Sequence, residues 1–249
     1  MLASRFRGGM CSVDRSVLHF NRPIVPVLLA FCACFVDVIC ITGLFHTFTA
    51  FISGTLVVLC VEVFNTGDNA LLKVFVLVVF FASSLFWYLA VSRLAETGAF
   101  SVRRLFVLEA VLIAAFMTVA GLWEPQLAGP LGTATLIAIA FSTVAMSLQN
   151  VIMLTLLNRH VPTTMMTGNS LKLVLGIADY FAHPGAREDS RARIRHQTLI
   201  ISAFAAGGLL ASFLVLSMGF WALAVPILVL LFLAAAQPSS PERSLVEPV

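Results

Sequence analysis

The amino-acid sequence predicts an all-α fold, a polytopic transmembrane helical bundle built from two related halves. Three observations predict it: an apolar composition, a series of long apolar stretches and an internal repeat. Hydrophobic residues make up 60% of the chain, charged residues only 11%, and the mean hydropathy is +1.01. A soluble domain carries about a quarter charged residues, so lipid must form part of the solvent of this chain.

Six apolar stretches are long enough to cross a membrane, because about 20 helical residues span a hydrocarbon core of roughly 30 Å. These stretches are residues 24–44, 74–91, 105–122, 131–157, 198–217 and 220–236. Two further segments, 48–64 and 163–181, are shorter or more polar. The sequence therefore predicts six spanning helices plus two short polar helical segments, and leaves open whether the two segments span or re-enter the membrane.

The order of these stretches divides the chain into four parts. The predicted parts are a basic cytoplasmic tail at 1–22, a first transmembrane repeat at 23–122, a second at 123–236 and a disordered tail at 237–249. The last part is rich in Pro, Ser and Glu, a composition typical of disorder. No cleavage site of the small-x-small type follows the first apolar stretch, so we interpret that stretch as a retained helix.

Arginine placement tests the topology, since basic loops stay on the cytoplasmic side. If both short segments re-enter, the loops that hold Arg93, Arg103, Arg104 and Arg159 all fall on the side of the N-terminus. Each half then has three true spans, an odd number, so the two halves are inverted with respect to each other. Against this arrangement, segment 48–64 is apolar enough to cross. On charge, we expect inverted halves with a cytoplasmic N-terminus.

The internal repeat is weak in identity but constant in order. Asp37 lies late in the first long stretch and Asn150 late in the fourth. Gly54 follows Asp37 by 17 residues, and Gly168 follows Asn150 by 18. The glycines stand in the triplets Ser53-Gly54-Thr55 and Thr167-Gly168-Asn169. Such triplets favour helix breaks that line a site between repeats; the alternative is that each glycine only permits close helix packing.

The same residues carry a family resemblance. Phe35-Val36-Asp37, Leu148-Gln149-Asn150 and the run VPTTMMTGN at 161–169 resemble the YoaK-like family of bacterial membrane proteins, domain of unknown function 1275, over residues 24 to 236. The resemblance implies a multi-pass protein of the bacterial inner (plasma) membrane and supplies no substrate or reaction. Ser53-Gly54-Thr55 stands where the family has Thr-Gly-Asn, which weakens the expectation of an equivalent asparagine in each half.

Polar side chains inside apolar stretches are the candidate site. A carboxylate at Asp37 is costly in lipid, so it either couples protons or binds a cation, or accepts hydrogen bonds from a neighbouring helix. Amides such as Gln149 line a cavity or join helices by hydrogen bonds. Glu109 is interpreted as a partly hydrated charge near the interface. The substrate-binding hypothesis comprises Asp37, Ser53, Gly54, Thr55, Gln149, Asn150, Thr167, Gly168 and Asn169.

Catalytic and metal-binding patterns are missing from the sequence. The five histidines are scattered over tails and loops, and no His-Glu-x-x-His, Gly-x-Ser-x-Gly or phosphate-loop motif occurs. Four of the five cysteines lie inside apolar runs, which is typical of packing rather than of a disulfide framework. The sequence therefore predicts no enzyme and no cofactor or metal. Ala203, Gly207 and Ala211 recur every four residues and predict a closely packed helix face.

The functional hypothesis is a small secondary transporter or permease-like protein with a polar solute site between its two repeats. The alternative is a non-transporting scaffold, or a protein that binds lipid or a partner. The expected partners are membrane lipids and an unknown small polar solute, with no nucleic acid because no supporting module is present. A homo-oligomer is left open.

Overall fold

The computed structural model describes residues 24–64, 67–96, 101–155, 166–183, 185 and 187–237. The predicted tail 1–22, residues 238–249 of the predicted C-terminal tail, Arg159 and residues 161–165 of the family motif lie outside these residues. Throughout the described part of the chain, the regular secondary structure is helical. The predicted all-α class is therefore confirmed.

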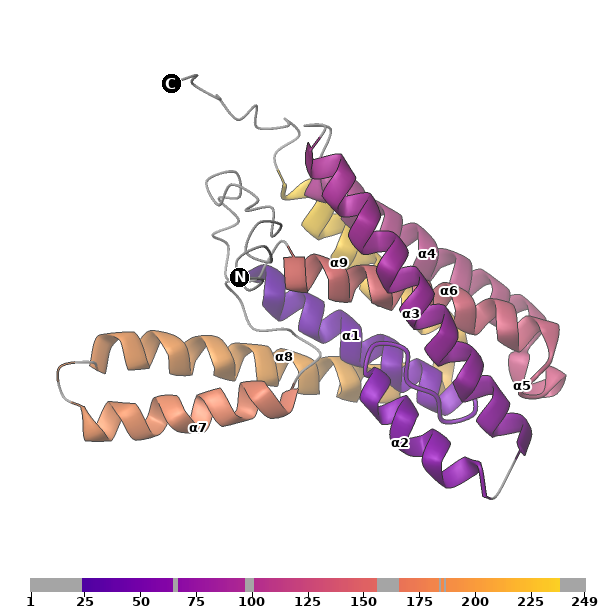
Figure 1. The fold of residues 1–249 in the computed structure, drawn as a ribbon, viewed down its shortest axis with the longest axis horizontal. Helices are drawn as coiled ribbons and strands as arrows, with labels where there is room; N and C mark the ends of the chain where they lie inside the picture. The colour runs from indigo at the N-terminus through magenta and orange to yellow at the C-terminus, as the bar shows by residue number, and fades with distance from the viewer. Residues whose placement is uncertain are drawn as a thin grey trace, which may run out of the picture.

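Figure 1 shows how the helices are arranged in the described part of the chain. In chain order they are α1 (Ile24–Gly43), α2 (Ile52–Glu62), α3 (Gly67–Glu96), α4 (Val102–Trp123), α5 (Pro125–Ala128), α6 (Thr133–Thr155), α7 (Met166–Ala182), α8 (Arg187–Met218), the 3-10 helix η2 (Gly219–Leu223) and α9 (Ala224–Ala235).

Five helical stretches are long and apolar enough to cross a membrane, so this is a multi-pass membrane protein. They are α1, residues 67–94 of α3, α4, α6 and the 49-residue run Arg187–Ala235. The sequence predicted six, with the last two separate. In the structure no loop separates these two stretches, because η2 connects α8 directly to α9. The chain turns within this connection, at Gly219, which has a φ of 55°. The two short segments are helical as predicted: α2 has 11 residues and α7 has 17.

The helices form an inner pair with an outer set around it. In their spanning windows, 72% of α1 and 67% of α6 is buried, against 17% of α3 and 22% of the run that contains α8. Helix α8 packs against α1, and α3 packs against α6. Helix α4 packs against α6 and α9, while α2 pairs with α3 and α7 with α8. The α7–α8 pair extends away from the rest of the bundle (Figure 1).

The two inner helices run in opposite directions. Gln149, near the end of α6, donates to the Leu29 carbonyl near the start of α1. At the other end of α1, Gln126 of α5 donates to the Thr42 carbonyl. Helix α1 therefore starts at the end of the bundle where α6 finishes.

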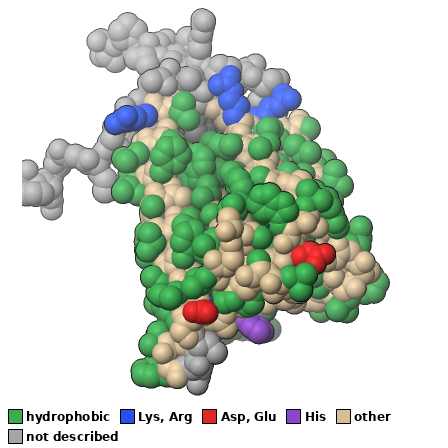
Figure 2. All heavy atoms as spheres, turned by 90° about the vertical axis from the view of Figure 1, so that its right-hand side faces the viewer, with side chains coloured by type: hydrophobic (Ala, Val, Ile, Leu, Met, Phe, Trp, Pro, Cys, Tyr) green, Lys and Arg blue, Asp and Glu red, His purple; other side chains and the backbone are tan. Residues whose placement is uncertain are grey.

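Basic and acidic side chains lie at opposite ends of the bundle. Arg93 lies in the last turn of α3 and Arg103 in the first turn of α4, at the end where α1 starts; we call this the basic end. Asp68 starts α3 and Glu124 follows α4 at the opposite, acidic end. Figure 2 shows Lys and Arg at one end of this face, Asp, Glu and His at the other, and a hydrophobic band between them. This separation of charge by an apolar band is the pattern of a bilayer-spanning protein.

Close contact between α8 and α1 depends on glycine. A Cβ added at Gly207 would lie 2.4 Å from the Phe31 carbonyl oxygen, and one at Gly208 would lie 2.8 Å from the Cys34 sulfur. Ala211 is fully buried, and Ala203 packs against the cluster that contains Ala30. The small-residue face predicted from the sequence is therefore confirmed as a helix-packing surface.

Candidate functional site

The carboxylate of Asp37 is the centre of a hydrogen-bonded seam. It accepts the backbone N–H groups of Thr49 at 2.7 Å, Ala50 at 2.8 Å and Phe51 at 2.9 Å. These groups lie just before α2, which begins at Ile52 and whose own first N–H groups have no partner within the helix. A carboxylate is well suited there, because the amino end of a helix carries partial positive charge. Asp37 therefore holds the start of α2 against α1.

Between α1 and α2 the backbone is irregular from residue 44 to 51, and half of these residues are buried. Leu44, Thr47 and Thr49 are each fully buried. Phe45 and His46 have left-handed φ values of 52° and 56°, which end α1 abruptly. Irregular backbone at membrane depth is tolerated only where protein or a water-filled cavity surrounds it. The segment 44–51 is thus a helix break enclosed by the bundle.

This break lies before the position that the sequence predicted. Ser53, Gly54 and Thr55 form the first turn of a regular α2 rather than an interruption. The Thr55 hydroxyl donates to the Phe48 carbonyl and accepts the Phe48 N–H, which closes the loop onto the helix. A Cβ at Gly54 would lie 2.5 Å from the Phe51 ring. Gly54 therefore leaves room for the aromatic rings of Phe48 and Phe51 in the preceding loop rather than for another helix.

Helix α6 contributes side chains to the same seam. The Ser142 hydroxyl lies 2.8 Å from the Thr49 hydroxyl and 3.3 Å from the Cys40 sulfur. The Asn150 amide donates to the Ala50 carbonyl at 3.4 Å and to the Met146 carbonyl at 3.0 Å. Asp37 of α1 and Asn150 of α6 therefore both bind Ala50.

A buried ion pair closes the break from the side of α3. The Lys73 ammonium is fully buried, lies 2.7 Å from Glu62 of α2 and also donates to the Phe45 carbonyl. Helix α3 starts at Gly67, seven residues before the predicted stretch at 74–91, so Lys73 lies inside the helix. Because Asp68 and Asn69 are polar, hydropathy does not assign this first turn to the spanning stretch.

The second triplet lies elsewhere. Thr167, Gly168 and Asn169 form the first turn of α7, where Asn169 is fully buried and Gly168 would accept a Cβ without contact among the described atoms. The neighbouring Met166 packs beside Val27 and Ala30 of α1. These positions lie 7 to 10 residues before Asp37, about 10–15 Å along the helix. The structure therefore does not bring the two triplets into one site.

Glu109 of α4 is fully buried, which contradicts its interpretation as a partly hydrated interfacial charge. Neither carboxylate oxygen has a hydrogen-bond partner among the described residues. Its neighbours one turn away, Leu105, Phe106 and Ile113, are buried apolar side chains. The sequence feature that indicates burial is the position of Glu109 inside the predicted spanning stretch 105–122.

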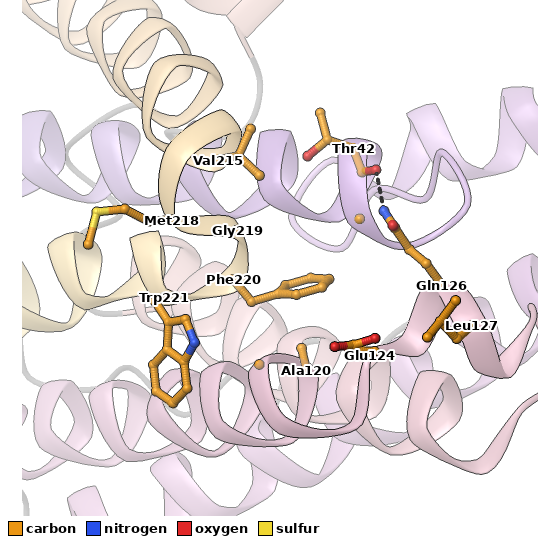
Figure 3. Close-up of a pocket in the computed structure, with 12 residues that line it drawn as sticks. Thr42, Ala120, Glu124, Gln126, Leu127, Val215, Met218, Gly219, Phe220 and Trp221 are labelled. Atoms are coloured by element: carbon orange, nitrogen blue, oxygen red, sulfur yellow. Dashed lines mark hydrogen bonds between the residues drawn. The ribbon is translucent and has the colours of Figure 1, made fainter.

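A cavity of about 390 Å³ opens at the acidic end, within the size range of small-molecule sites. Its wall combines the ends of α1 and α4 with α5 and η2 (Figure 3). Glu124 supplies the one charged side chain among the lining residues, and Phe220 and Trp221 supply aromatic rings. Gln126 lies across one side through its bond to the Thr42 carbonyl. In the described part of the chain, no group of three His, Cys, Asp or Glu side chains is placed to hold a metal ion.

Comparisons with known proteins identify a family and no function. No curated protein and no solved structure matches the chain. A family model described as "Protein of unknown function (DUF1275)" matches residues 25–236, almost the whole described chain, and confirms the resemblance seen in the sequence motifs. The chain therefore belongs to the DUF1275 family.

Proposed function

We propose that this protein is a small secondary transporter of the bacterial inner membrane, with a polar solute site between its two halves and a cytoplasmic N-terminus. One observation carries the proposal: the buried break at 44–51, on which Asp37 of α1 and Asn150 of α6 converge. Transporters form their sites from interrupted helices at the interface between repeats, near the middle of the membrane.

The arrangement of helices supports two inverted repeats, α1 to α4 and α6 to α9. The first helices, α1 and α6, run in opposite directions and both occupy the centre. The third helix of each unit packs on the first helix of the other: α3 on α6, and α8 on α1. The second helix of each unit, α2 or α7, pairs with the third. Inverted repeats of this kind permit alternating access by rocking one unit against the other.

Asp37 has a holding role in this proposal. Its carboxylate already accepts three backbone N–H groups, so it positions the break rather than binding solute directly. The solute enters through the cavity lined by Glu124 and Phe220 at the acidic end. Movement of α6 relative to α1 then opens the polar seam at Thr49 and Ser142 to the solute.

The second candidate function is a scaffold that binds lipid or a partner protein. The mutual hydrogen bonding of the seam favours it, because Asp37, Thr49 and Ser142 satisfy one another. Helix α7 also presents apolar side chains such as Val174, 60% exposed, and Phe181, 73% exposed. In this function the seam joins helices and does not open.

A solute screen distinguishes the two functions. Purified protein in lipid nanodiscs is tested by thermal unfolding against amines, amino acids, carboxylates, sugars and inorganic ions. A solute that binds only the folded state raises its stability, by about 2.7 kcal/mol at a concentration of 100 Kd. We expect one class to stabilise the wild type, with a smaller shift in Asn150→Ala. Thr118→Val is the matched control, because the Thr118 hydroxyl is exposed and bonds only to carbonyls of its own helix.

Uptake of that solute into proteoliposomes completes the test. Uptake above protein-free vesicles supports transport. A stabilising solute without uptake, or no stabilising solute in the whole panel, contradicts transport and favours the scaffold.

A further inference from the structure

Glu109 is a buried carboxyl that the seam does not use. Its side chain is fully buried, and both oxygens lack a hydrogen-bond donor among the described residues. Asp37, by contrast, accepts three N–H groups. An ionised carboxylate in such surroundings would lose its hydration without any compensating bond, at a cost of several kcal/mol or more. In the state that the structure describes, Glu109 is therefore neutral and carries a proton.

The surroundings of Glu109 contain little else that titrates. Helix α4 packs against α6 and α9, and neither of these helices contains an acidic, basic, histidine, cysteine or tyrosine side chain. On α1, the Cys32 thiol is within electrostatic range of Glu109 and points its sulfur at the Pro226 carbonyl, 3.9 Å away. On α4 itself, Arg103 and Arg104 are exposed and lie five to six residues before Glu109, about 8–9 Å along the helix.

Glu109 is buried, but it lies close enough to the basic end for water to reach it from that side. Arg103 and Arg104 mark the basic end of the bundle, so Glu109 is about one and a half helical turns below the surface on that side. A small separation of α4 from α6 and α9 there would admit water to the carboxyl. Buried ionisable groups within spanning helices mark proton relays and ion pathways. A carboxyl that water never reaches would only lower the stability of the fold.

We propose that Glu109 is a proton-exchanging site that couples transport to protons, an inference that rests on the proposed transport function. In the closed state the carboxyl is protonated. When the basic end opens, the O–H bond breaks, the proton passes to a water molecule and the electron pair stays on the carboxylate. Closure requires a proton to return from water. Solute movement therefore accompanies protonation of Glu109 and not of Asp37.

Infrared spectroscopy of the full chain in lipid bilayers tests the site directly, using H₂O and D₂O as the probes. A protonated carboxyl gives a C=O stretching band that shifts when its proton is replaced by a deuteron. We expect such a band at neutral pH, a shift of that band in D₂O and loss of the band as the pH rises. The band should be lost in Glu109→Gln and kept in Asp37→Asn. Glu109→Gln has nearly the same volume as the wild type, so the core remains packed.

Two results would overturn the proton-exchanging site: no band attributable to Glu109 at any pH, or a band that never shifts in D₂O, because a sealed carboxyl is structural. Proton coupling is tested separately with the solute found by the screen. In Glu109→Gln we expect exchange of that solute to persist, while its accumulation driven by a pH gradient is lost. Accumulation unchanged in Glu109→Gln overturns the coupling. A shifting band combined with a failed solute screen rejects transport and leaves the exchanging site in place.

Discussion

Single side chains replace water for backbone groups that lie at membrane depth. Asp37 serves the N–H groups of residues 49–51, Thr55 serves both backbone groups of Phe48, and Lys73 serves the Phe45 carbonyl. Each unpaired backbone group in such a place costs free energy comparable to a lost hydrogen bond. The break between α1 and α2 therefore persists because a few side chains pair its backbone.

Asp37→Asn should destabilise the protein even though it preserves volume. Asn offers one acceptor oxygen instead of two, and its NH₂ group would face a backbone N–H group. Hydrogen bonds to charged groups contribute about 1.5–3 kcal/mol, so we expect the free energy of unfolding to fall by roughly 2–3 kcal/mol. Denaturant-induced unfolding in detergent measures this, with Thr118→Val as the control. An unchanged midpoint would show that the carboxylate does not hold the break.

Tyr180 offers a titration outside the five spanning stretches. Its hydroxyl accepts a hydrogen bond from Arg191 at 2.9 Å, and this bond together with the positive charge of Arg191 lowers the pKa of the phenol below its usual value. The chain has two tyrosines, so Tyr88→Phe leaves Tyr180 as the only one. In that background, we expect Arg191→Gln to raise the pKa of Tyr180. Ultraviolet absorbance measures the ionisation, and an unchanged or lowered pKa contradicts the contact.

Elements meet through glycine where their backbones touch. We expect Gly207→Ala to lower the free energy of unfolding by roughly 1–3 kcal/mol, since the added methyl would lie 2.4 Å from a backbone oxygen of α1 that cannot move freely. Gly168→Ala is the matched control, because its Cβ meets nothing within 4 Å among the described atoms. It should leave stability unchanged or raise it by up to about 1 kcal/mol through helix propensity. Equal effects of the two substitutions would contradict the close contact of α8 with α1.

The ion pair between α2 and α3 should behave as a coupled unit. Glu62→Gln leaves the Lys73 ammonium buried without its charged partner, at an expected cost of about 3–5 kcal/mol. Combining Glu62→Gln with Lys73→Met removes both charges and should cost clearly less. A double-mutant cycle of unfolding free energies gives the coupling. Additive effects would mean that the two charges do not interact.

The long apolar helices were predictable from the sequence, but the position of the helix break was not. The predicted stretches 24–44 and 105–122 match α1 and α4 within three residues at each end, because apolar length alone determines a spanning helix. The break was misplaced onto Ser53–Thr55, since the carboxylate that makes it lies on another helix. Asp37 and Asn150 were correctly singled out as polar positions inside spans, and the structure adds that they share Ala50.

Burial of Glu109 and Lys73 depended on tertiary packing. Both lie near helix ends, where sequence alone suggests contact with water or headgroups. Their full burial follows from the way α4 packs on α6 and α9, and from the ion pair that draws Lys73 toward α2. Hydropathy contains no information on which neighbouring helix covers a given side chain.

At the scale of the whole molecule, the proposed transport requires the two proposed units, α1 to α4 and α6 to α9, to move against each other. Ser142→Cys places a second thiol beside Cys40, whose sulfur lies 3.3 Å from the native Ser142 hydroxyl. Oxidation should then join α1 to α6, the central helices of the two units. We expect solute uptake to be lost on oxidation and regained on reduction.

The control for this crosslink is the combination of Cys40→Ala with Ser142→Cys, which cannot form the bond and should transport under either condition. Full uptake by the oxidised Ser142→Cys protein, with the disulfide verified by mass spectrometry, would contradict rocking at this interface.

The packing of α8 on α1 also sets the timing of biogenesis. Gly207 follows Phe31 by 176 residues. At a synthesis rate of about 5–20 residues per second, the ribosome adds that length in roughly 9–35 s. Throughout this interval α1 has been synthesised, but α8, whose small-residue face packs against Phe31, does not yet exist. The nascent first half must therefore be sheltered by the insertion machinery or by lipid, and a chain truncated before α8 should be a substrate for membrane proteases.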